Sequence, residues 1–318
     1  MYMHPSCTAQ EDQETLRSLM TPDPVTVGPG EGLDRAIGLL ERHGFRHLPV
    51  VEEERVVGIL SDRDLRLSTG MLRATRRARD HQGRKLPCAE RVSEVMRSSV
   101  FCLPSDSAAS RAAREMVERE IGALPVVDGG RLVGIVTETD LLQASLDLCR
   151  RTDGRCDDLA RYHMHRPLTC VTPEITLEEA LDALDRRIGH LGVVREQALI
   201  GILAERDLRV GLARAMIRDA QAQSEGRMED VTTTVRQVMT HFVTTVQPGT
   251  MLSACASRML EGRLSALPVL EDGVPIGIIT QRNVLEYFAA VTASARSAVQ
   301  AAATDHERDD LRSRIPSS

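Results

Sequence analysis

The chain has 318 residues and carries 40 basic and 46 acidic side chains, so its formal net charge is −6. Hydrophobic residues make up 42% and charged residues 27%, a balance typical of globular proteins that excludes a disordered or fibrous chain. This length predicts about two domains. Four Phe, three Tyr and no Trp argue against the binding of single-stranded nucleic acid, which stacks its bases on aromatic rings.

Membrane and secretory signals are missing from the sequence. No apolar run approaches the roughly 20 residues that span a bilayer, and residues 1–14 lack the basic flank and apolar core of a signal peptide. Seven cysteines, an odd number scattered along the chain, do not form the pattern of a disulfide framework. We therefore expect a cytoplasmic protein that does not bind membranes.

The first predicted elements form a unit of strand, helix, strand, strand and helix. The β-branched residues 25–27 predict a strand. Residues 33–40 carry apolar side chains at the i, i+3, i+4 and i+7 spacing of a helix. Two apolar segments, 48–51 and 56–60, flank a polar turn and predict a hairpin, and a second helix begins near Asp62.

This unit recurs three more times. The segment Leu48-Pro49-Val50-Val51 returns as Leu124-Pro125-Val126-Val127, Leu191-Gly192-Val193-Val194 and Leu267-Pro268-Val269-Leu270. The strand start Gly58-Ile59 returns as Gly134-Ile135, Gly201-Ile202 and Gly277-Ile278. The first two copies are spaced as the last two are, so the chain is a pair of units that was duplicated.

Pairing of the units follows from their size. A unit of about 60 residues buries too little surface to be stable alone, so we expect each half of the chain to form one domain of mixed α/β (α+β) class. The expected boundaries are 1–150, with units at about 16–75 and 92–148, and 151–318, with units at about 160–218 and 235–290 and a C-terminal tail.

A polar motif joins the last strand of each unit to its last helix. The four copies are Ser61-x-x-Asp64, Thr137-x-x-Asp140, Ala204-x-x-Asp207 and Thr280-x-x-Asn283. A hydroxyl and a carboxylate at this spacing can form a capping box, which is a structural role. The same groups at a helix N-terminus also suit a ribose phosphate, because the hydroxyl can donate to a phosphate oxygen and the carboxylate can accept both hydrogen bonds of a ribose diol. The residues alone support both interpretations.

The fourfold pattern of Gly, two apolar residues, Ser or Thr, two residues and Asp or Asn resembles the cystathionine-β-synthase (CBS) domain family over about residues 16–290. The resemblance implies units of β-α-β-β-α that pair into two Bateman modules, with clefts that bind adenosyl ligands. It extends to the regulatory subunit of AMP-activated protein kinase. It implies an adenine nucleotide (AMP, ADP or ATP, the last with Mg²⁺) as ligand, with NAD, S-adenosylmethionine and cyclic di-AMP as the alternatives that the family also binds. We expect a homodimer, and the composition predicts no nucleic-acid or membrane partner.

The resemblance also assigns roles to the motif residues. Ser61 and Thr137 would contact phosphate or ribose, and Asp64 and Asp140 would bind the ribose diol. The second module matches more weakly through Asp207, Thr280 and Asn283, because Ala204 replaces a hydroxyl and Asn283 replaces a carboxylate. The first module is therefore expected to hold the better sites.

Two further groups of residues belong to the predicted site. Basic residues near the start of the Leu-Pro-Val-Val strand would face the phosphates; these are Arg46, His47, His190 and Arg263. Their structural alternative is a solvated arginine or a histidine at the edge of the core. The adenine would lie against the first strand of a unit, such as residues 101–103.

Other chemistry has weaker support. Cys149, Cys156, His163 and His165 do not have the spacing of a standard zinc finger, so we expect a linker and no metal. Residues 71–97 carry eight basic and three acidic side chains, which favours a solvated helix facing an acidic partner over nucleic acid. No catalytic arrangement stands out, so we expect a nucleotide sensor that is not an enzyme. The alternative is an association scaffold with empty clefts, or metal binding through the linker.

Overall fold

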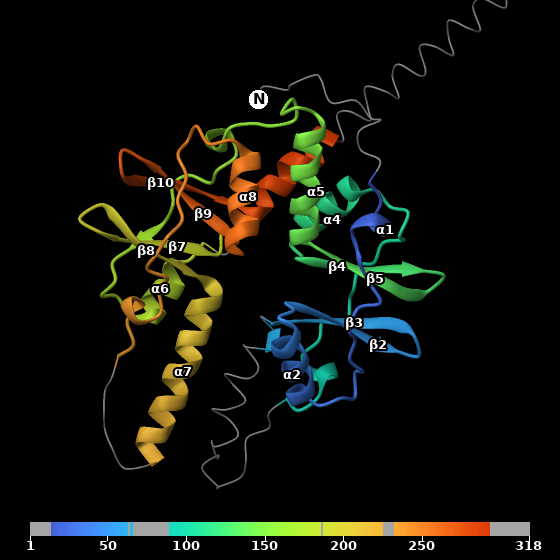
Figure 1. Cartoon of the computed structure of the whole chain (residues 1–318). Coiled ribbons are helices and arrows are strands. Elements are labelled where there is room, and N and C mark those ends of the chain that lie inside the picture. The colour runs from blue at the N-terminus through green and yellow to red at the C-terminus, as the bar shows by residue number, and fades with distance from the viewer. Residues whose placement is uncertain (1–13, 63, 66–88, 186, 225–231, 293–318) are drawn as a thin grey trace, which may run out of the picture.

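The structure is a computed structural model that describes residues 14–62, 64–65, 89–185, 187–224 and 232–292. Helices and small, mostly antiparallel sheets alternate along this part of the chain, which confirms the expected mixed α+β class (Figure 1). Most of the basic stretch, residues 71–88, and the tail from residue 293 lie outside the described residues.

The elements follow the predicted fourfold order. In the first half they are α1 (Leu16–Leu19), β1 (Thr21–Pro22), α2 (Leu33–His43), β2 (His47–Glu52), β3 (Arg55–Ser61), η1 (Val92–Glu94), α4 (Ala109–Arg119), β4 (Ala123–Asp128), β5 (Arg131–Thr137) and α5 (Glu138–Arg151). In the second half they are η2 (Ala160–Tyr162), β6 (Cys170–Val171), α6 (Leu177–Ala183), β7 (His190–Arg195), β8 (Ala198–Ala204), α7 (Glu205–Ser224), η3 (Val235–Gln237), α8 (Leu252–Gly262), β9 (Ala266–Glu271), β10 (Val274–Thr280) and a helix over residues 281–292.

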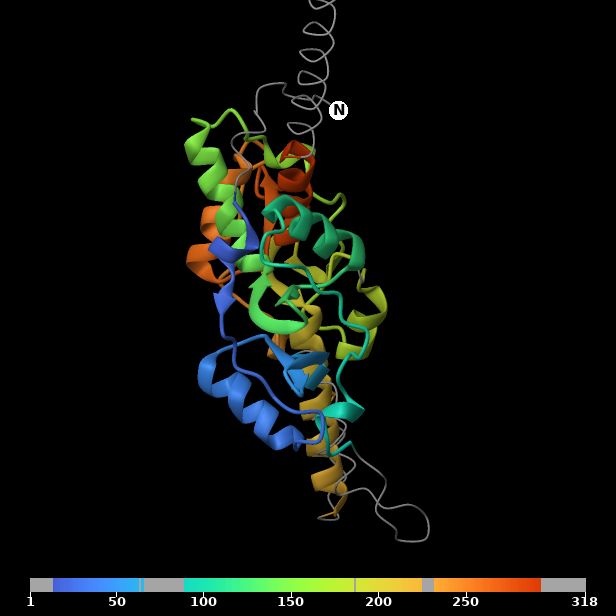
Figure 2. The ribbon, with the colours of Figure 1, turned by 90° about the vertical axis from the view of Figure 1, so that its right-hand side faces the viewer.

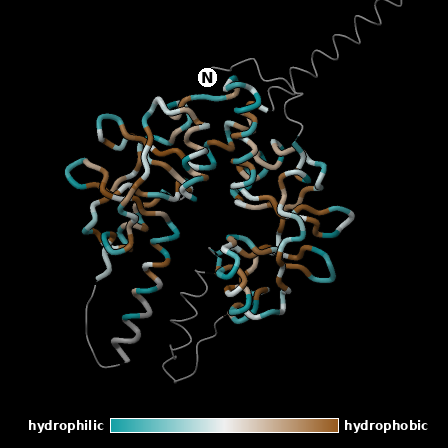
Figure 3. The backbone as a smooth tube through the Cα atoms, in the orientation of Figure 1, coloured by the Kyte–Doolittle hydropathy of each residue, from teal (hydrophilic) through white to brown (hydrophobic). Residues whose placement is uncertain are grey.

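Each unit centres on a hairpin covered by an amphipathic helix. In unit one, β2 pairs antiparallel with β3, and α2 buries Leu33, Ala36 and Leu40 against them, as the helical spacing predicts. The apolar strands lie inside and the hydrophilic turns project outward (Figure 3). The predicted strand over residues 25–27 is shorter than expected, because Val27 forms only one parallel bridge to the hairpin.

Within each pair of units, the segment that precedes one unit packs on the hairpin of the other unit. We call residues 14–24, 89–99, 157–167 and 232–242 the lead segments of units one to four. The lead segment of unit one does not join its own hairpin, because β1 pairs with β5 of unit two. In return, Arg97 of the second lead segment forms an antiparallel bridge to Ile59 of unit one. The second half repeats the exchange, so neither unit of a pair has a complete sheet alone.

A methionine of each lead segment lies over the motif glycine of the partner unit. The four pairs are Gly58 with Met96, Gly134 with Met20, Gly201 with Met239 and Gly277 with Met164. A Cβ atom added at the glycine would lie 2.4 Å from the sulfur in the first half and 2.8 Å from it in the second. The repeated glycine therefore leaves room for the methionine side chain that packs the lead segment against the partner unit.

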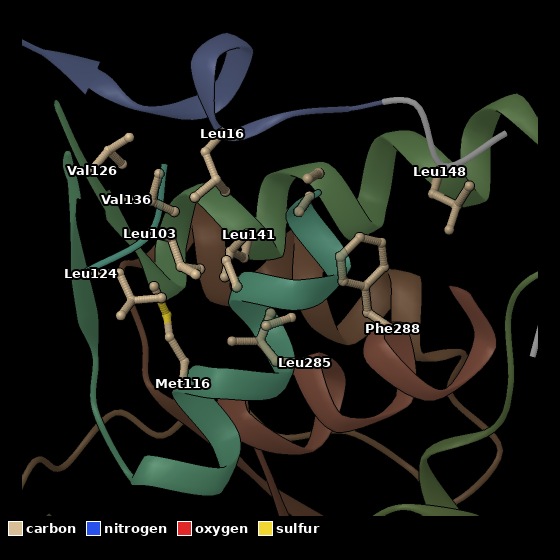
Figure 4. Close-up of a cluster of buried hydrophobic side chains, with 14 of the residues drawn as sticks. Leu16, Leu103, Met116, Leu124, Val126, Val136, Leu141, Leu148, Leu285 and Phe288 are labelled. Atoms are coloured by element: carbon tan, nitrogen blue, oxygen red, sulfur yellow. The ribbon is translucent and has the colours of Figure 1, made fainter. Parts of the chain in front are cut away.

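The two halves, which we call module one and module two, join through units two and four. Leu285 and Phe288 of the helix over 281–292 enter the core of unit two beside Leu141 (Figure 4). In return, Leu142 and Leu146 of α5 belong to the core of unit four. Units one and three lie away from this junction, as both views show (Figures 1 and 2). No helix in the described part of the chain is long and apolar enough to cross a membrane.

The glycine–methionine contact generates a stability prediction. In Gly277→Ala, the new methyl group would lie 2.7 Å from the backbone oxygen of His165 and 2.8 Å from the sulfur of Met164. We expect the free energy of unfolding to fall by about 1–3 kcal/mol in a urea titration, because the lead segment must shift. Gly30→Ala is the control, since its methyl group would meet nothing within 4 Å. Equal stability of the two variants would contradict the prediction.

Candidate functional site

The motif forms a capping box at the start of the last helix in three units. In unit two, the backbone N–H and Oγ1 of Thr137 donate to Oδ2 of Asp140 at 2.8 and 2.7 Å. In unit four, Thr280 makes the same two bonds to Oδ1 of Asn283 at 2.9 and 2.8 Å. Ser61 and Asp64 repeat the arrangement in unit one. Capping uses one atom of the carboxyl or amide group and leaves the other for a second interaction.

The motif carboxylates of units two and three keep oxygen atoms without a partner in the described part of the chain. Asp140 makes no further hydrogen bond or ion pair with a described residue, and its side chain is half-buried. Asp207, which has Ala204 in place of the hydroxyl, makes neither kind of contact with the part of the chain that is described, and it is half-buried as well. These two carboxylates can each accept hydrogen bonds from an incoming group.

In units one and four, a residue of the partner's lead segment faces the motif. The guanidinium Nε of Arg97 lies 3.8 Å from Oδ1 of Asp64. In unit four, Nδ2 of Asn283 donates to Nε2 of His165 at 3.0 Å. The motif residues are therefore not equivalent, although the capping geometry of units one, two and four is nearly the same.

The two histidines of the predicted site are held between the paired units. Burial lowers the pKa of His47 to about 4, and a Cβ atom at Gly122 of unit two would lie 3.2 Å from its ring. Burial also lowers the pKa of His190. Its Nδ1 is 2.8 Å from the oxygen of Ile188, and its Nε2 is 3.0 Å from Oγ of Ser265 in unit four. Near neutral pH, His47 and His190 therefore offer hydrogen bonds rather than positive charge.

The two predicted arginines, Arg46 and Arg263, are exposed. Arg46 lies close enough to Glu138 to oppose a rise in the pKa of that carboxyl, which is raised by burial; Arg282 opposes the rise more strongly. Arg263 ends α8 in the left-handed conformation, with a φ of 51°. Its side chain makes no hydrogen bond or ion pair with a described residue. The structure therefore places Arg46 near the start of α5 and Arg263 at the end of α8.

Charged residues inside the motif connect the two modules. Nε of Arg206 lies 3.6 Å from Oδ2 of Asp62, and Nη1 of Arg282 lies 3.5 Å from Oε1 of Glu120. Both arginines come from module two and both carboxylates from module one. The sequence shows the charged residues of the motif but does not indicate these pairs, because the partners are far apart along the chain.

A cavity of about 520 Å³ opens between the hairpin turns of module one. It is lined by Glu53, Glu54, Arg55, Val56, Cys102, Val127, Gly129, Gly130 and Arg131. Arg131 of unit two pairs with Glu54 of unit one at 2.6 Å. Cys102 belongs to the stretch predicted to lie along the adenine. Val56 and Ser61 are five residues apart on β3, roughly 16 Å, so the cavity and the motif of unit one lie at opposite ends of this strand.

The residues of the cysteine–histidine run have separate partners. Cys149 donates to the backbone oxygen of Cys156 at 2.9 Å, and Nε2 of His163 lies 2.9 Å from Oδ2 of Asp158. His165 contacts Asn283 instead. Among the residues that the structure describes, no group of three or more His, Cys, Asp or Glu side chains could hold a metal ion.

The half-buried His47 generates a pH prediction. Its pKa is about 4 in the folded protein and 6.5 in the unfolded chain, so the unfolded chain gains a proton first as the pH falls. The contribution of neutral His47 is complete above pH 6.5 and is lost between pH 6.5 and about 4, at up to about 1.4 kcal/mol per pH unit. We expect His47→Gln to flatten this fall in unfolding free energy, measured by urea titration at several pH values.

The control for this prediction is His241→Gln, which replaces an exposed histidine. It should keep the pH dependence of the natural protein. A His47→Gln variant whose stability falls as steeply as that of the natural protein would show that His47 is not the group that titrates.

Comparison with known proteins agrees with this architecture. The sequence profile of the CBS domain family matches residues 16–68, 92–147, 157–214 and 235–290. The uncharacterized protein MJ1225 of Methanocaldococcus jannaschii is 28% identical over 272 residues, which are 83% of this chain and 95% of that protein.

Two solved structures share the fold along most of the chain. The crystal structure of MJ1225, described as a candidate archaeal homologue of γ-AMPK, has a TM-score of 0.68 at 24% identity and covers 86% of this chain and 100% of its own. An uncharacterized conserved protein from Pyrococcus horikoshii has a TM-score of 0.58 at 22% identity, covering 86% of this chain and 99% of its own. Since the family profile matches well over half of the sequence in four segments, the protein belongs to the CBS domain family and contains four CBS domains.

Proposed function

We propose that this protein is a sensor that binds an adenine nucleotide (AMP, ADP or ATP) between paired CBS domains and regulates a partner protein. The observation that carries the proposal is the motif of unit two. Thr137 and Asp140 are fixed to each other at the start of α5, and the second oxygen of Asp140 has no partner among the described residues. The arrangement combines a structural cap with an acceptor for a ligand.

The chemistry of this group of atoms matches a ribose phosphate. The free oxygen of Asp140 can accept from the ribose hydroxyls, and the hydroxyl oxygen of Thr137 keeps lone pairs for a further hydrogen bond. The backbone N–H groups at the start of α5 favour the negative charge of a phosphate. Arg46 and Arg282 both act on Glu138 at this helix start, so they are the nearest candidates to balance additional phosphate charge.

The proposal ranks the remaining residues. Ser61 and Asp64 form the second site of module one, and Asp207 is the corresponding acceptor of unit three. His47 and His190, both neutral, would donate or accept hydrogen bonds at the interface of the paired units. Binding is proposed without bond-making chemistry. A bound ligand shifts the population of module arrangements by preferring one of them. A homodimer, a cytoplasmic location and Mg²⁺ accompanying ATP complete the proposal.

The proposal is tested by calorimetric titration of the full chain with ATP, ADP, AMP, NAD and S-adenosylmethionine. We expect saturable binding of at least one adenine nucleotide. Silence with all five would instead favour a scaffold that acts by protein association.

The role of Asp140 is tested separately. Asp140→Ala removes two charge-assisted hydrogen bonds to the ribose, and after rehydration of the hydroxyls we expect a net loss of about 2–3 kcal/mol, roughly 30–150-fold in affinity. This variant also removes a cap worth about 1 kcal/mol of stability. Asp140→Asn separates the two effects, because Asn283 shows that an amide oxygen can fill the same capping box.

We therefore expect Asp140→Asn to keep the melting temperature of the natural protein but to bind nucleotide about tenfold more weakly or worse. Asp147→Asn, on the exposed face of α5, is the matched control and should bind normally. The difference in affinity between the natural protein and Asp140→Asn should be smaller for the 2′-deoxynucleotide than for the ribonucleotide. Unchanged affinity in Asp140→Asn would leave Asp140 with a capping role alone.

A further inference from the structure

The exchange of lead segments brings one side chain to the same place in every unit. The residue that follows each lead-segment methionine forms an antiparallel bridge to the residue that follows the motif glycine of the partner unit. The four pairs are Thr21 with Ile135, Arg97 with Ile59, His165 with Ile278 and Thr240 with Ile202. The backbone pairing therefore holds one residue of the partner's lead segment beside each motif.

The side chains of these four residues make different contacts with the motifs. Thr21 and Thr240 make no side-chain hydrogen bond to a motif residue within the described chain. The side chain of Arg97 is 58% exposed, and its Nε lies 3.8 Å from Oδ1 of Asp64. An ion pair this exposed contributes little to stability. His165 is different, because it accepts a hydrogen bond from Asn283 at 3.0 Å.

Asn283 has no capacity left for a ligand. Its Oδ1 accepts two hydrogen bonds from Thr280, and its Nδ2 donates to His165 and approaches Oε2 of Glu286 at 3.5 Å. Its residue is 2% exposed and Thr280 is 7% exposed, whereas Thr137 and Asp140 of unit two are half-buried. An incoming ribose would have to break the bond to His165 and would find no carboxylate in return.

The helix that begins at this closed motif also holds the modules together. Two and five residues beyond Asn283, Leu285 and Phe288 enter the core of unit two (Figure 4). Movement at the start of this helix would disturb that core. A motif that binds no ligand therefore suits a helix whose role is to join the two modules.

We propose that the fourth CBS domain is closed to ligand from within the chain, with the imidazole of His165 in the place that a ribose takes in the other units. This inference rests on the proposed function and names which sites respond to ligand. Nucleotide binds in units one to three only, and unit four is a rigid element of the module junction.

The first experiment measures stoichiometry, with the nucleotide that binds the natural protein most tightly in the calorimetric series. We expect Asn283→Ala to melt at a lower temperature yet to retain the number of sites and to change affinity less than about twofold. Asp140→Asn is the matched variant in an open unit and should lose affinity. Loss of one site in Asn283→Ala would overturn the inference.

The second experiment reads closure without any ligand. Thr280→Cys and Thr137→Cys place a thiol at equivalent positions of a closed and an open motif, and iodoacetamide labelling is followed by peptide mass spectrometry because the chain has its own cysteines. We expect the closed position to react about tenfold more slowly or worse. Adding His165→Ala to Thr280→Cys should recover at least about half of that difference on a logarithmic scale.

The two experiments fail in different ways. If no nucleotide binds the natural protein, the proposed function is wrong, and the labelling contrast still decides whether unit four is closed. Equal labelling of Thr280→Cys and Thr137→Cys would overturn the inference even if nucleotide binds as proposed. A labelling contrast that His165→Ala leaves unchanged would also overturn it, because His165 would not be the group that closes the motif.

Discussion

The exchange of lead segments is the constraint on which the rest of the structure depends. A unit of about 60 residues has a small core, and here each unit leaves its sheet to be completed by the segment that precedes its partner. The contact is between a methionine and a glycine that has no side chain to obstruct it, as with Met20 over Gly134. Pairing within a module therefore completes both sheets, and a single CBS domain of this chain is an incomplete structure.

The same exchange builds the candidate sites. Because the residue after each methionine is held beside the partner's motif, each candidate site adjoins residues of two units. The bridged residues are 38 positions apart in sequence for units one and three, and 113 or 114 positions apart for units two and four. Unit two faces Thr21, unit one faces Arg97 and unit four faces His165. One repeated geometry thus leaves the motif of unit two open, places an exposed arginine beside that of unit one and closes that of unit four. Divergence of the four units is achieved at the lead segments as much as at the motifs.

The helix that carries the proposed site of unit two also joins the two modules. The start of α5 holds Thr137 and Asp140, and its next turns supply Leu141 to the core of unit two and Leu142 and Leu146 to that of unit four. A displacement at the capping box would therefore be transmitted to two cores, which are close-packed and do not deform continuously. The ion pairs of Arg206 with Asp62 and Arg282 with Glu120 cross between the modules beside the motifs.

The sequence by itself determined the fourfold repeat, the hairpins, the amphipathic helices and the polar motif, because these features follow from local periodicity and from residues close together in the chain. It also supported the CBS resemblance, and it left the capping and binding interpretations of the motif equally open. Only the tertiary structure decided that Leu16 belongs to the core of unit two, that His47 is a neutral side chain between units, and that His165 occupies the motif of unit four. Each of these depends on contacts between residues that are far apart in the chain. Such contacts determine desolvation and hydrogen-bond geometry, but they produce no local pattern in the sequence.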